Sequence, residues 1–326
     1  MSIETTYFLG AGASKAFYPS LPLAGELTLD YILGRRGVPV GFDEAIERVE
    51  RYIASSQWSR ERRVITFERI YSCFPANLPP YFPRENLEIC LFRKLRIEGV
   101  GAVPHSWLKR TLYSSNPILT TNYDTVIEWD VENLSIGPVG YGDSGLIDYG
   151  IPEDLCLPLP SGGPRMDGMD KKLLLLKLYG SISWSRCQQC GRYVLERIYE
   201  AEAERAKMGR GKCRGCGATQ RNAVFVPLVG AKTPDDQGLI AIWDKAERVL
   251  SESDHIVFAG FSLDPNDRGI TGLLHRAARS QRPRRVTVVR RGRNPEVLER
   301  YKAIYGDRVE VYDSGWAQYL LALSES

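Results

Sequence analysis

The stretch Thr5-Thr6-Tyr7-Phe8-Leu9-Gly10-Ala11-Gly12-Ala13-Ser14 indicates what kind of fold this chain of 326 residues adopts. The apolar part, Thr5–Leu9, predicts a short buried strand that runs directly into a glycine-rich loop. Glycines after a strand let the backbone approach a phosphate group, and a following helix can offer free N–H groups to it. The third glycine of the dinucleotide fingerprint is absent, so an ordinary strand-to-helix turn is the alternative.

Outward from this segment, short apolar runs alternate with amphipathic segments. Alternation of strands and helices predicts an α/β fold built on a parallel sheet. The expected strands cover residues 116–121, 173–178, 223–227, 255–260, 285–289 and 309–312, and the expected helices cover 240–253, 269–280 and 294–305. Residues 28–103 have a mostly helical pattern and are predicted to form a helical insertion. A long loop is expected over residues 137–168.

Composition limits the class of protein. Hydrophobic residues make up 43% of the chain and charged residues 25%, which is typical of a soluble globular protein. The net charge of +3 argues against a dedicated nucleic-acid coat, although residues 276–293 are locally basic. The N-terminus lacks the pattern of a secretory signal, and no apolar stretch reaches the length of a membrane span. We therefore expect a cytoplasmic protein.

Two cysteine doublets predict a metal site. Cys187 and Cys190 form one Cys-x-x-Cys, and Cys213 and Cys216 form the second. Each doublet makes a tight turn that offers two thiolates to a tetrahedral Zn²⁺ ion. Four thiolates leave no open position for a substrate, so a structural zinc is expected, in a zinc-ribbon module over residues 186–219.

Polar residues follow two of the expected strands. Thr121, Asn122 and Asp124 come after the strand at 116–121, and Gly260 and Ser262 come after the strand at 255–260. Ligands bind at the carboxyl ends of strands in open α/β sheets. The alternative interpretation is that Asn122 and Asp124 cap the next helix and that residues 260–263 form a plain turn.

Taken in chain order, these segments resemble the sirtuin family, and especially its divergent bacterial sirtuin-like branch. The resemblance extends from about residue 7 to about residue 290 and leaves out the helical block 28–103. The deacylases' Asp-Phe-Arg segment is missing from this sequence. The matching segments are Gly10–Ser14, Leu21–Leu27, Pro104-His105, Thr120–Asp124, Leu178–Ser181, the four cysteines and Gly260–Leu263.

The resemblance implies a Rossmann-like parallel sheet with helices on both faces, which binds NAD⁺ across its carboxyl edge. That domain would comprise residues 1–185 and 220–326, interrupted by the zinc module. Asn122 would orient the ribose or the attacking group, and Asp124 would hold the nicotinamide carboxamide. The phosphates would lie on Gly10, Ala11, Gly12 and Ser14, with Thr121 beside them, and the adenosine side on Gly260 and Ser262.

Tyr179 departs from the family pattern, because the sirtuin general base is a histidine at this place in Leu-His-Gly-Ser. A tyrosine with a reference pKa of about 10 is a poor base near neutral pH. The three histidines, His105, His255 and His275, stand in no catalytic motif. Arg290 and Arg291 follow the strand at 285–289, where they either favour a phosphorylated ribose or form a solvated basic patch.

The resemblance therefore implies an NAD⁺-binding protein with NAD⁺ glycohydrolase-type chemistry, of the kind found in antiphage defence effectors, with activity weakened or lost at Tyr179. The alternatives are an inactive subunit that binds or senses a nucleotide, an NAD-dependent protein-lysine deacylase, and a scaffold without a ligand. Expected partners are NAD⁺ or an ADP-ribose derivative, together with a second copy of the chain or a defence-system protein. No membrane or clear nucleic-acid partner is expected.

Overall fold

The computed structural model describes residues 3–34, 47, 49–51, 67, 71, 83–95, 97, 103–135, 146–157, 172–195, 213, 215–218, 221–225, 236–280 and 282–325. Most of the expected helical insertion, most of the long loop at 137–168, and the charged segment between the cysteine doublets lie outside the described residues.

The core of the fold is a seven-stranded sheet in which every neighbouring pair is parallel. The strand order is β10-β9-β8-β1-β2-β4-β3, so β1 lies in the middle, between β8 and β2. This confirms the predicted α/β fold with a parallel sheet. The strands are β1 (Ile3–Leu9), β2 (Ile118–Thr120), β3 (Ile147–Asp148), β4 (Leu173–Lys177), β8 (Ser253–Ala259), β9 (Arg285–Val289) and β10 (Val309–Tyr312).

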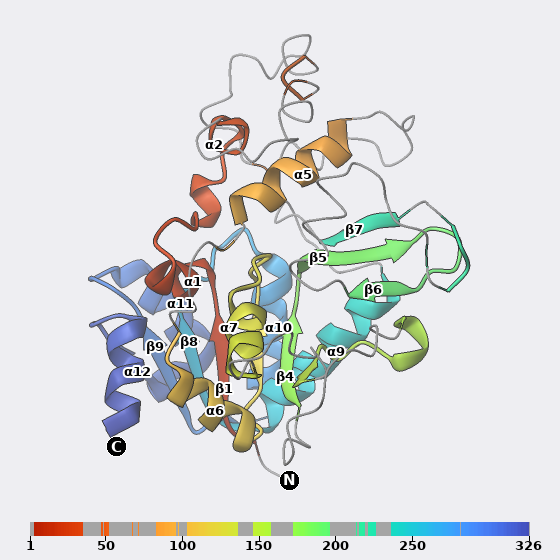
Figure 1. The fold of residues 1–326 in the computed structure, drawn as a ribbon. Helices are drawn as coiled ribbons and strands as arrows, with labels where there is room; N and C mark the ends of the chain where they lie inside the picture. Colours follow the sequence, from red (N-terminus) through yellow and green to blue (C-terminus); the bar gives the residue numbers. More distant parts are fainter. Residues whose placement is uncertain are drawn as a thin grey trace.

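Helices cover both faces of this sheet, as expected for a Rossmann-like fold (Figure 1). One face carries α9 (Gln237–Glu252), α10 (Arg268–Ala278) and α11 (Pro295–Tyr305). The other carries α1 (Ala11–Phe17), α6 (His105–Tyr113), α7 (Val126–Ser135) and α12 (Trp316–Glu325).

Alternation along β1 explains the two layers, because successive side chains of a strand point to opposite faces. Phe8 packs against Phe258 and Phe261 on the first face, with ring centroids 5.2 and 4.9 Å away. Tyr7 packs against Trp107 and Trp316 on the second, at 5.2 and 6.1 Å. Both side chains are buried, so a single strand anchors two separate apolar layers.

Polar caps start the helices of the first face. The Asp236 carboxylate accepts hydrogen bonds from the backbone N–H groups of Gly238 and Leu239 at the start of α9. Asn294 caps α11 in the same way and is followed by proline, which suits the first turn of a helix. These caps supply acceptors for N–H groups that have no partner within the first turn of α9 and α11.

A second, three-stranded antiparallel sheet lies beside the first, in the order β6-β5-β7 (Figure 1). It consists of β5 (Gly180–Cys187), β6 (Tyr193–Leu195) and β7 (Arg221–Phe225). Figure 1 also shows α2 (Leu29–Leu33) and α5 (Pro83–Leu95) stacked together beyond one end of the large sheet. Among the described residues, no helix combines the length and apolar character that a membrane crossing requires.

Candidate functional site

The predicted site residues gather at one edge of the sheet because the strands that carry them are neighbours. The predicted loop Gly10–Ser14 follows β1 and is in fact the N-cap and first turn of α1. Thr121–Asp124 follows β2, Tyr179 follows β4, and Gly260–Ser262 follows β8. These strands are adjacent in the order β8-β1-β2-β4 and run parallel, so their carboxyl ends share an edge. At this edge the chain leaves β1 toward α1 on one face of the sheet and leaves the neighbouring β8 toward α10 on the other face. Open α/β sheets bind ligands at such a point.

The glycines at positions 10, 12 and 260 allow two backbone turns to touch. The N–H of Gly12 donates to the carbonyl of Gly260 at 3.0 Å. A Cβ on Gly10 would lie 2.5 Å from the carbonyl oxygen of Gly260, and a Cβ on Gly260 would lie 2.0 Å from the nitrogen of Ala13. Gly260 also has a φ of +62°, a left-handed value that favours glycine. Packing thus accounts for these glycines before any ligand is considered.

Hydrogen bonds from Thr120 shape the turn after β2. Its hydroxyl donates to the carbonyl of Leu9 at 2.9 Å and accepts the N–H of Asn122 at 3.1 Å. The side-chain amide of Asn122 then donates to the hydroxyl oxygen of Ser14 at 3.0 Å. These contacts connect the turn after β2 to the end of β1 and to the first turn of α1.

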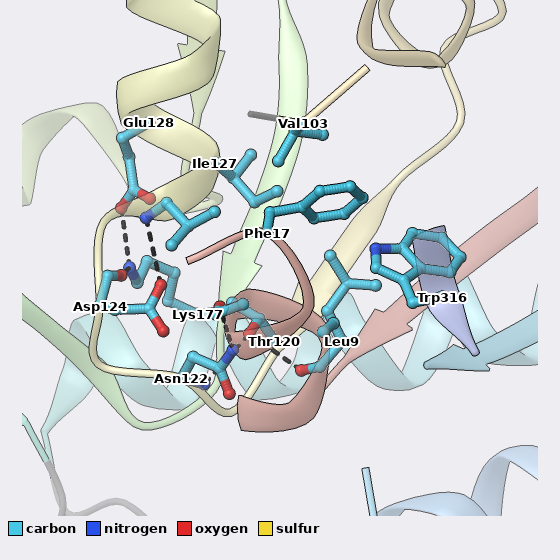
Figure 2. A pocket seen from close by; sticks show the side chains of 13 residues that line it. Leu9, Phe17, Val103, Thr120, Asn122, Asp124, Ile127, Glu128, Lys177 and Trp316 are labelled. Atoms are coloured by element: carbon cyan, nitrogen blue, oxygen red, sulfur yellow. Dashed lines mark hydrogen bonds and ion pairs between the residues drawn. The ribbon is translucent and has the colours of Figure 1, made fainter. Parts of the chain in front are cut away.

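Ser14 links Asn122 to Asp124. The Ser14 hydroxyl, whose oxygen accepts from Asn122, also lies beside the buried Asp124 carboxylate and opposes the rise in the pKa of that group. That carboxylate accepts the N–H of Val126 at 3.1 Å as well, at the start of α7. The structure therefore brings three of the predicted site residues together in one set, which we call the Ser14–Asn122–Asp124 set. Figure 2 shows Asn122 and Asp124 of this set.

Two charged residues that sequence reasoning missed lie against this set. Lys177, at the end of β4, is only 1% exposed and donates from Nζ to Oε1 of Glu128 at 2.8 Å. It also donates to the backbone carbonyl of Asp124. Burial raises the pKa of the Asp124 and Glu128 carboxyls, and the Lys177 ammonium group opposes that rise. The available signal was a lysine that ends an otherwise apolar strand.

A small pocket borders the set (Figure 2). Its polar lining includes Asn122, Asp124 and Lys177, and its apolar lining includes Phe17 and Trp316. The pocket has a volume of ≈ 10 Å³ for the centre of a water molecule, so it holds about one water. Apolar walls with a few convergent polar groups are typical of small-molecule sites, and a larger guest requires the apolar side chains to move aside.

Tyr179 is buried at 2% exposure, and its hydroxyl donates to Oδ1 of Asp267 at 2.5 Å. The partner of this hydroxyl, Asp267, is also the residue that caps α10. The ring also contacts Trp243, with centroids 5.9 Å apart. Burial, together with the Asp267 carboxylate, raises the pKa of Tyr179 far above neutrality, so the phenol keeps its proton.

Of the two arginines after β9, Arg290 makes structural hydrogen bonds and Arg291 is exposed. Arg290 donates from Nε to Asp313 at 2.7 Å and from a terminal nitrogen to the carbonyl of Asn294 at 2.6 Å, so it joins two loops. Arg291 is exposed. Ser262 is exposed too, and its carbonyl accepts a hydrogen bond from Arg300 at 3.1 Å.

The histidines with described side chains lie away from the site. His255 is hydrogen-bonded to Thr287 at 2.8 Å near the amino end of β8, opposite to the edge that carries the site. His275 is exposed in the last turn of α10. The side chain of His105 is outside the described residues.

The four predicted metal ligands come together at the end of the small sheet. The sulfur atoms of Cys187, Cys190, Cys213 and Cys216 all lie within 4.8 Å of one another. Sγ of Cys187 is 3.6 Å from that of Cys216, and Sγ of Cys190 is 3.7 Å from that of Cys213. Tetrahedral zinc with Zn–S bonds of about 2.3 Å needs sulfurs about 3.8 Å apart, so the donors fit this ion.

Backbone N–H groups prepare one of these ligands for metal binding. Those of Cys190 and Gln189 donate to the sulfur of Cys187 and lower the pKa of its thiol to about 6. Thiolates, and not thiols, bind metal ions.

Comparison with known proteins gives structural neighbours alone. No protein-family model matches the chain. No curated protein matches it either. A solved serine-to-alanine mutant of a Sir2 homologue with ADP-ribose is 14% identical, covers 100% of this chain and 95% of its own, and has a TM-score of 0.46.

Two further Sir2 structures align over 100% of this chain. A histidine-to-asparagine mutant of a Sir2 homologue with ADP-ribose is 15% identical over 95% of its own chain, with a TM-score of 0.47. A histidine-to-tyrosine Sir2 mutant with a p53 peptide and NAD is 14% identical over 94% of its own chain, with a TM-score of 0.41. Identities and TM-scores are low, so these structures carry no argument about the function of this chain.

Proposed function

We propose that this protein binds NAD⁺ or a close derivative at the carboxyl edge of the seven-stranded sheet, and that the site is built for NAD⁺ glycohydrolase-type chemistry. The observation that carries the proposal is the Ser14–Asn122–Asp124 set, which lies between the turns after β1 and β2. Its members are those that the sirtuin resemblance assigns to the nicotinamide–ribose end of NAD⁺.

Each member of the set has a chemical use in this reaction. The NH₂ group of Asn122 is held by Ser14, so its carbonyl oxygen is oriented to accept a hydrogen bond from a ribose hydroxyl or from an attacking water. The Asp124 carboxyl can hydrogen-bond the nicotinamide carboxamide. Water then forms a bond to C1′ of the ribose, the bond from C1′ to nicotinamide breaks, and ADP-ribose, nicotinamide and one proton result.

Tyr179 limits the rate of this chemistry. Its phenol is a hydrogen-bond donor to Asp267 with a raised pKa, so it does not take a proton from the attacking water. Loss of a positioned base costs about 10²–10⁴-fold in rate. We therefore propose weak or absent NAD⁺ cleavage by this chain, whose role on the sirtuin resemblance is that of an antiphage defence component in the cytoplasm.

The test measures binding and cleavage separately. Calorimetry with NAD⁺, NADP⁺ and ADP-ribose measures affinity, and chromatography of nicotinamide measures cleavage. Binding of at least one of the three supports the proposal, and no binding of any of them at millimolar concentration overturns it. Asn122→Ala should weaken both signals, whereas Ser324→Ala, at the exposed end of α12, should change neither.

A second candidate is a binding or sensing subunit without catalytic activity. The Tyr179–Asp267 hydrogen bond favours this candidate, because the residue at the expected position of the base makes a structural contact instead. Nucleotide binding without any nicotinamide release would support it. An acyl-lysine peptide in a further arm tests the deacylase alternative, for which nicotinamide release should depend on the peptide.

We also propose that the four-cysteine cluster holds one structural zinc ion. The sulfur spacing and the lowered pKa of Cys187 support this assignment. Four thiolates would complete a tetrahedral shell, so the ion would stabilise the small sheet and take no part in NAD⁺ chemistry. The division of the chain into a nucleotide-binding domain and a zinc module at residues 186–219 belongs to the same proposal.

A further inference from the structure

We propose that Lys177 is a positioning residue of the site: its buried ammonium group holds the turn that presents Asn122 and Asp124. For its functional meaning the inference rests on the proposed function, whereas the contacts that carry it involve no ligand. Lys177 would act through the backbone of the turn and not on a reacting atom.

The contacts of Lys177 join three elements. The residue ends β4, its Nζ donates to Oε1 of Glu128 on α7 at 2.8 Å, and it also donates to the backbone carbonyl of Asp124 in the turn after β2 (Figure 2). A lysine ammonium group has three donors on a compact centre, so a single atom can serve both acceptors. The main chain of the turn is thereby connected to the strand next to β2.

Stability alone does not require this arrangement. Lys177 and Glu128 are 1% and 4% exposed, and a buried ion pair can often be replaced by apolar side chains without loss of stability. Such a replacement cannot supply a hydrogen-bond donor to the carbonyl of Asp124. Only the ammonium group can contact the turn after β2 through the carbonyl of Asp124. This contact distinguishes a positioning role from a purely structural one.

The end of β4 is itself held firmly, so it can serve as an anchor. The indole N–H of Trp243, on α9, donates to the carbonyl of Leu178 at 2.6 Å, and the N–H of Leu178 donates to the carbonyl of Thr120 at 2.9 Å. Lys177 therefore extends from a fixed backbone to the turn. The distance from Asp124 to Asn122 along the chain is short, so a shift at the carbonyl of Asp124 displaces the amide that contacts Ser14.

The experiment compares two variants with opposite expectations. Glu128→Gln removes the charge of the partner but leaves the donor to Asp124, so the melting temperature should fall while the side-chain amide signal of Asn122 in ¹⁵N NMR stays near its wild-type position. The double variant Lys177→Met with Glu128→Met removes both charges and the donor. Its melting temperature should exceed that of Lys177→Met alone, and its Asn122 signal should move.

Affinity for ADP-ribose, measured by calorimetry, gives the functional readout. The double variant should bind at least about tenfold more weakly than wild type, even though it is folded. A double variant with wild-type Asn122 signal and wild-type affinity would overturn the inference. If wild type binds no ADP-ribose, NAD⁺ or NADP⁺, the proposed function fails, and the Asn122 signal still decides the role of Lys177: a shift in the double variant supports it and an unchanged signal overturns it.

Discussion

The hydroxyl of Tyr179 donates a 2.5 Å hydrogen bond to Oδ1 of Asp267, the carboxylate that also caps α10 through the N–H of Ile270 at 3.1 Å. One carboxylate thus connects the turn after β4 to the helix after β8. The phenol completes this contact only as a donor, because burial and the neighbouring carboxylate keep it protonated.

The first prediction is that Tyr179→His increases NAD⁺ cleavage by at least about tenfold, the cautious side of the general-base range. A histidine next to the Asp267 carboxylate would be oriented by it and would titrate near neutral pH. Tyr179→Phe should leave the weak basal rate unchanged and should destabilise the fold by about 1–3 kcal/mol, because Asp267 loses its donor. Nicotinamide release and thermal unfolding measure these effects.

Robust cleavage by the wild-type chain that persists in Tyr179→Phe would place the base elsewhere. Asp267→Asn separates the two roles of the carboxylate. The Asp267→Asn variant keeps an acceptor for the N–H of Ile270 at the start of α10 but removes the charge. It should therefore reduce the cleavage rate gained by Tyr179→His strongly and lower the melting temperature only slightly.

A second prediction concerns the Ser14–Asn122–Asp124 set. Ser14→Ala removes the hydroxyl that joins Asn122 to Asp124 and should weaken binding of NAD⁺ or ADP-ribose by about tenfold, with a smaller effect on stability. Gly12→Val should also abolish binding. However, a Cβ on Gly12 would lie 2.9 Å from Cα of Gly260, so that variant is expected to lose stability as well and is the weaker probe. Equal affinity of wild type and Ser14→Ala would remove Ser14 from the site.

Metal content supplies a third prediction. Protein purified without a chelator should contain one zinc ion per chain, and Cys213→Ser should lower both the zinc content and the melting temperature, since the binding energy of a structural zinc is also folding energy. Cys156→Ser is the matched control, because Cys156 is a free cysteine outside the four-sulfur cluster. Elemental analysis that finds no zinc in the wild-type protein would contradict the assignment.

The fourth prediction is a pH effect from Asp130, which is 0% exposed. Burial raises the pKa of this carboxyl to about 7, against opposing hydrogen bonds from the hydroxyl of Tyr18 and the N–H of Val103. The pKa of Asp130 is higher in the folded protein than the value of about 3.9 in the unfolded chain, so protonated Asp130 stabilises the fold. This stabilisation is fully present below about pH 4 and is lost as the pH rises through about 7. The loss amounts to at most about 4 kcal/mol.

Thermal unfolding between pH 5 and 8 measures this effect. Asp130→Asn cannot ionise, so its melting temperature should fall less over this range than that of wild type. Asp154→Asn, at an exposed position, should follow the wild-type curve. Parallel curves for wild type and Asp130→Asn would show that Asp130 does not titrate in this range.

Much of the sheet could be predicted because its strands are apolar runs with clear ends. The strands at 285–289 and 309–312 have the expected bounds, and the strand expected at 255–260 spans Ser253–Ala259. The strand β5 was not predicted, although its residues alternate between polar and apolar from Ser181 to Ser185. The helix α12 was also missed, although Trp316, Tyr319 and Leu320 show helical spacing and pack on the sheet.

The site residues also separate into those that the sequence could indicate and those that it could not. Asn122 and Asp124 could be found because polar residues after a buried strand are visible in one segment. The pairing of Lys177 with Glu128 could not, because lysine and glutamate are usually solvent-exposed and the two residues belong to elements far apart in sequence. The position of Lys177 at the end of an apolar strand was the one available signal. The direction of the Tyr179 hydroxyl was also unpredictable, because its partner Asp267 is 88 positions away along the chain.

The central position of β1 has a consequence for biosynthesis. Among the described strands, β1 is translated first, yet one of its two hydrogen-bonded neighbours, β8, ends at Ala259. Until that late segment is translated, one edge of β1 has no partner strand and Phe8 lacks its contact with Phe258. We therefore expect ribosome-attached nascent chains that lack β8 to be degraded rapidly by added protease, and chains long enough for β8 to have left the ribosome to become resistant.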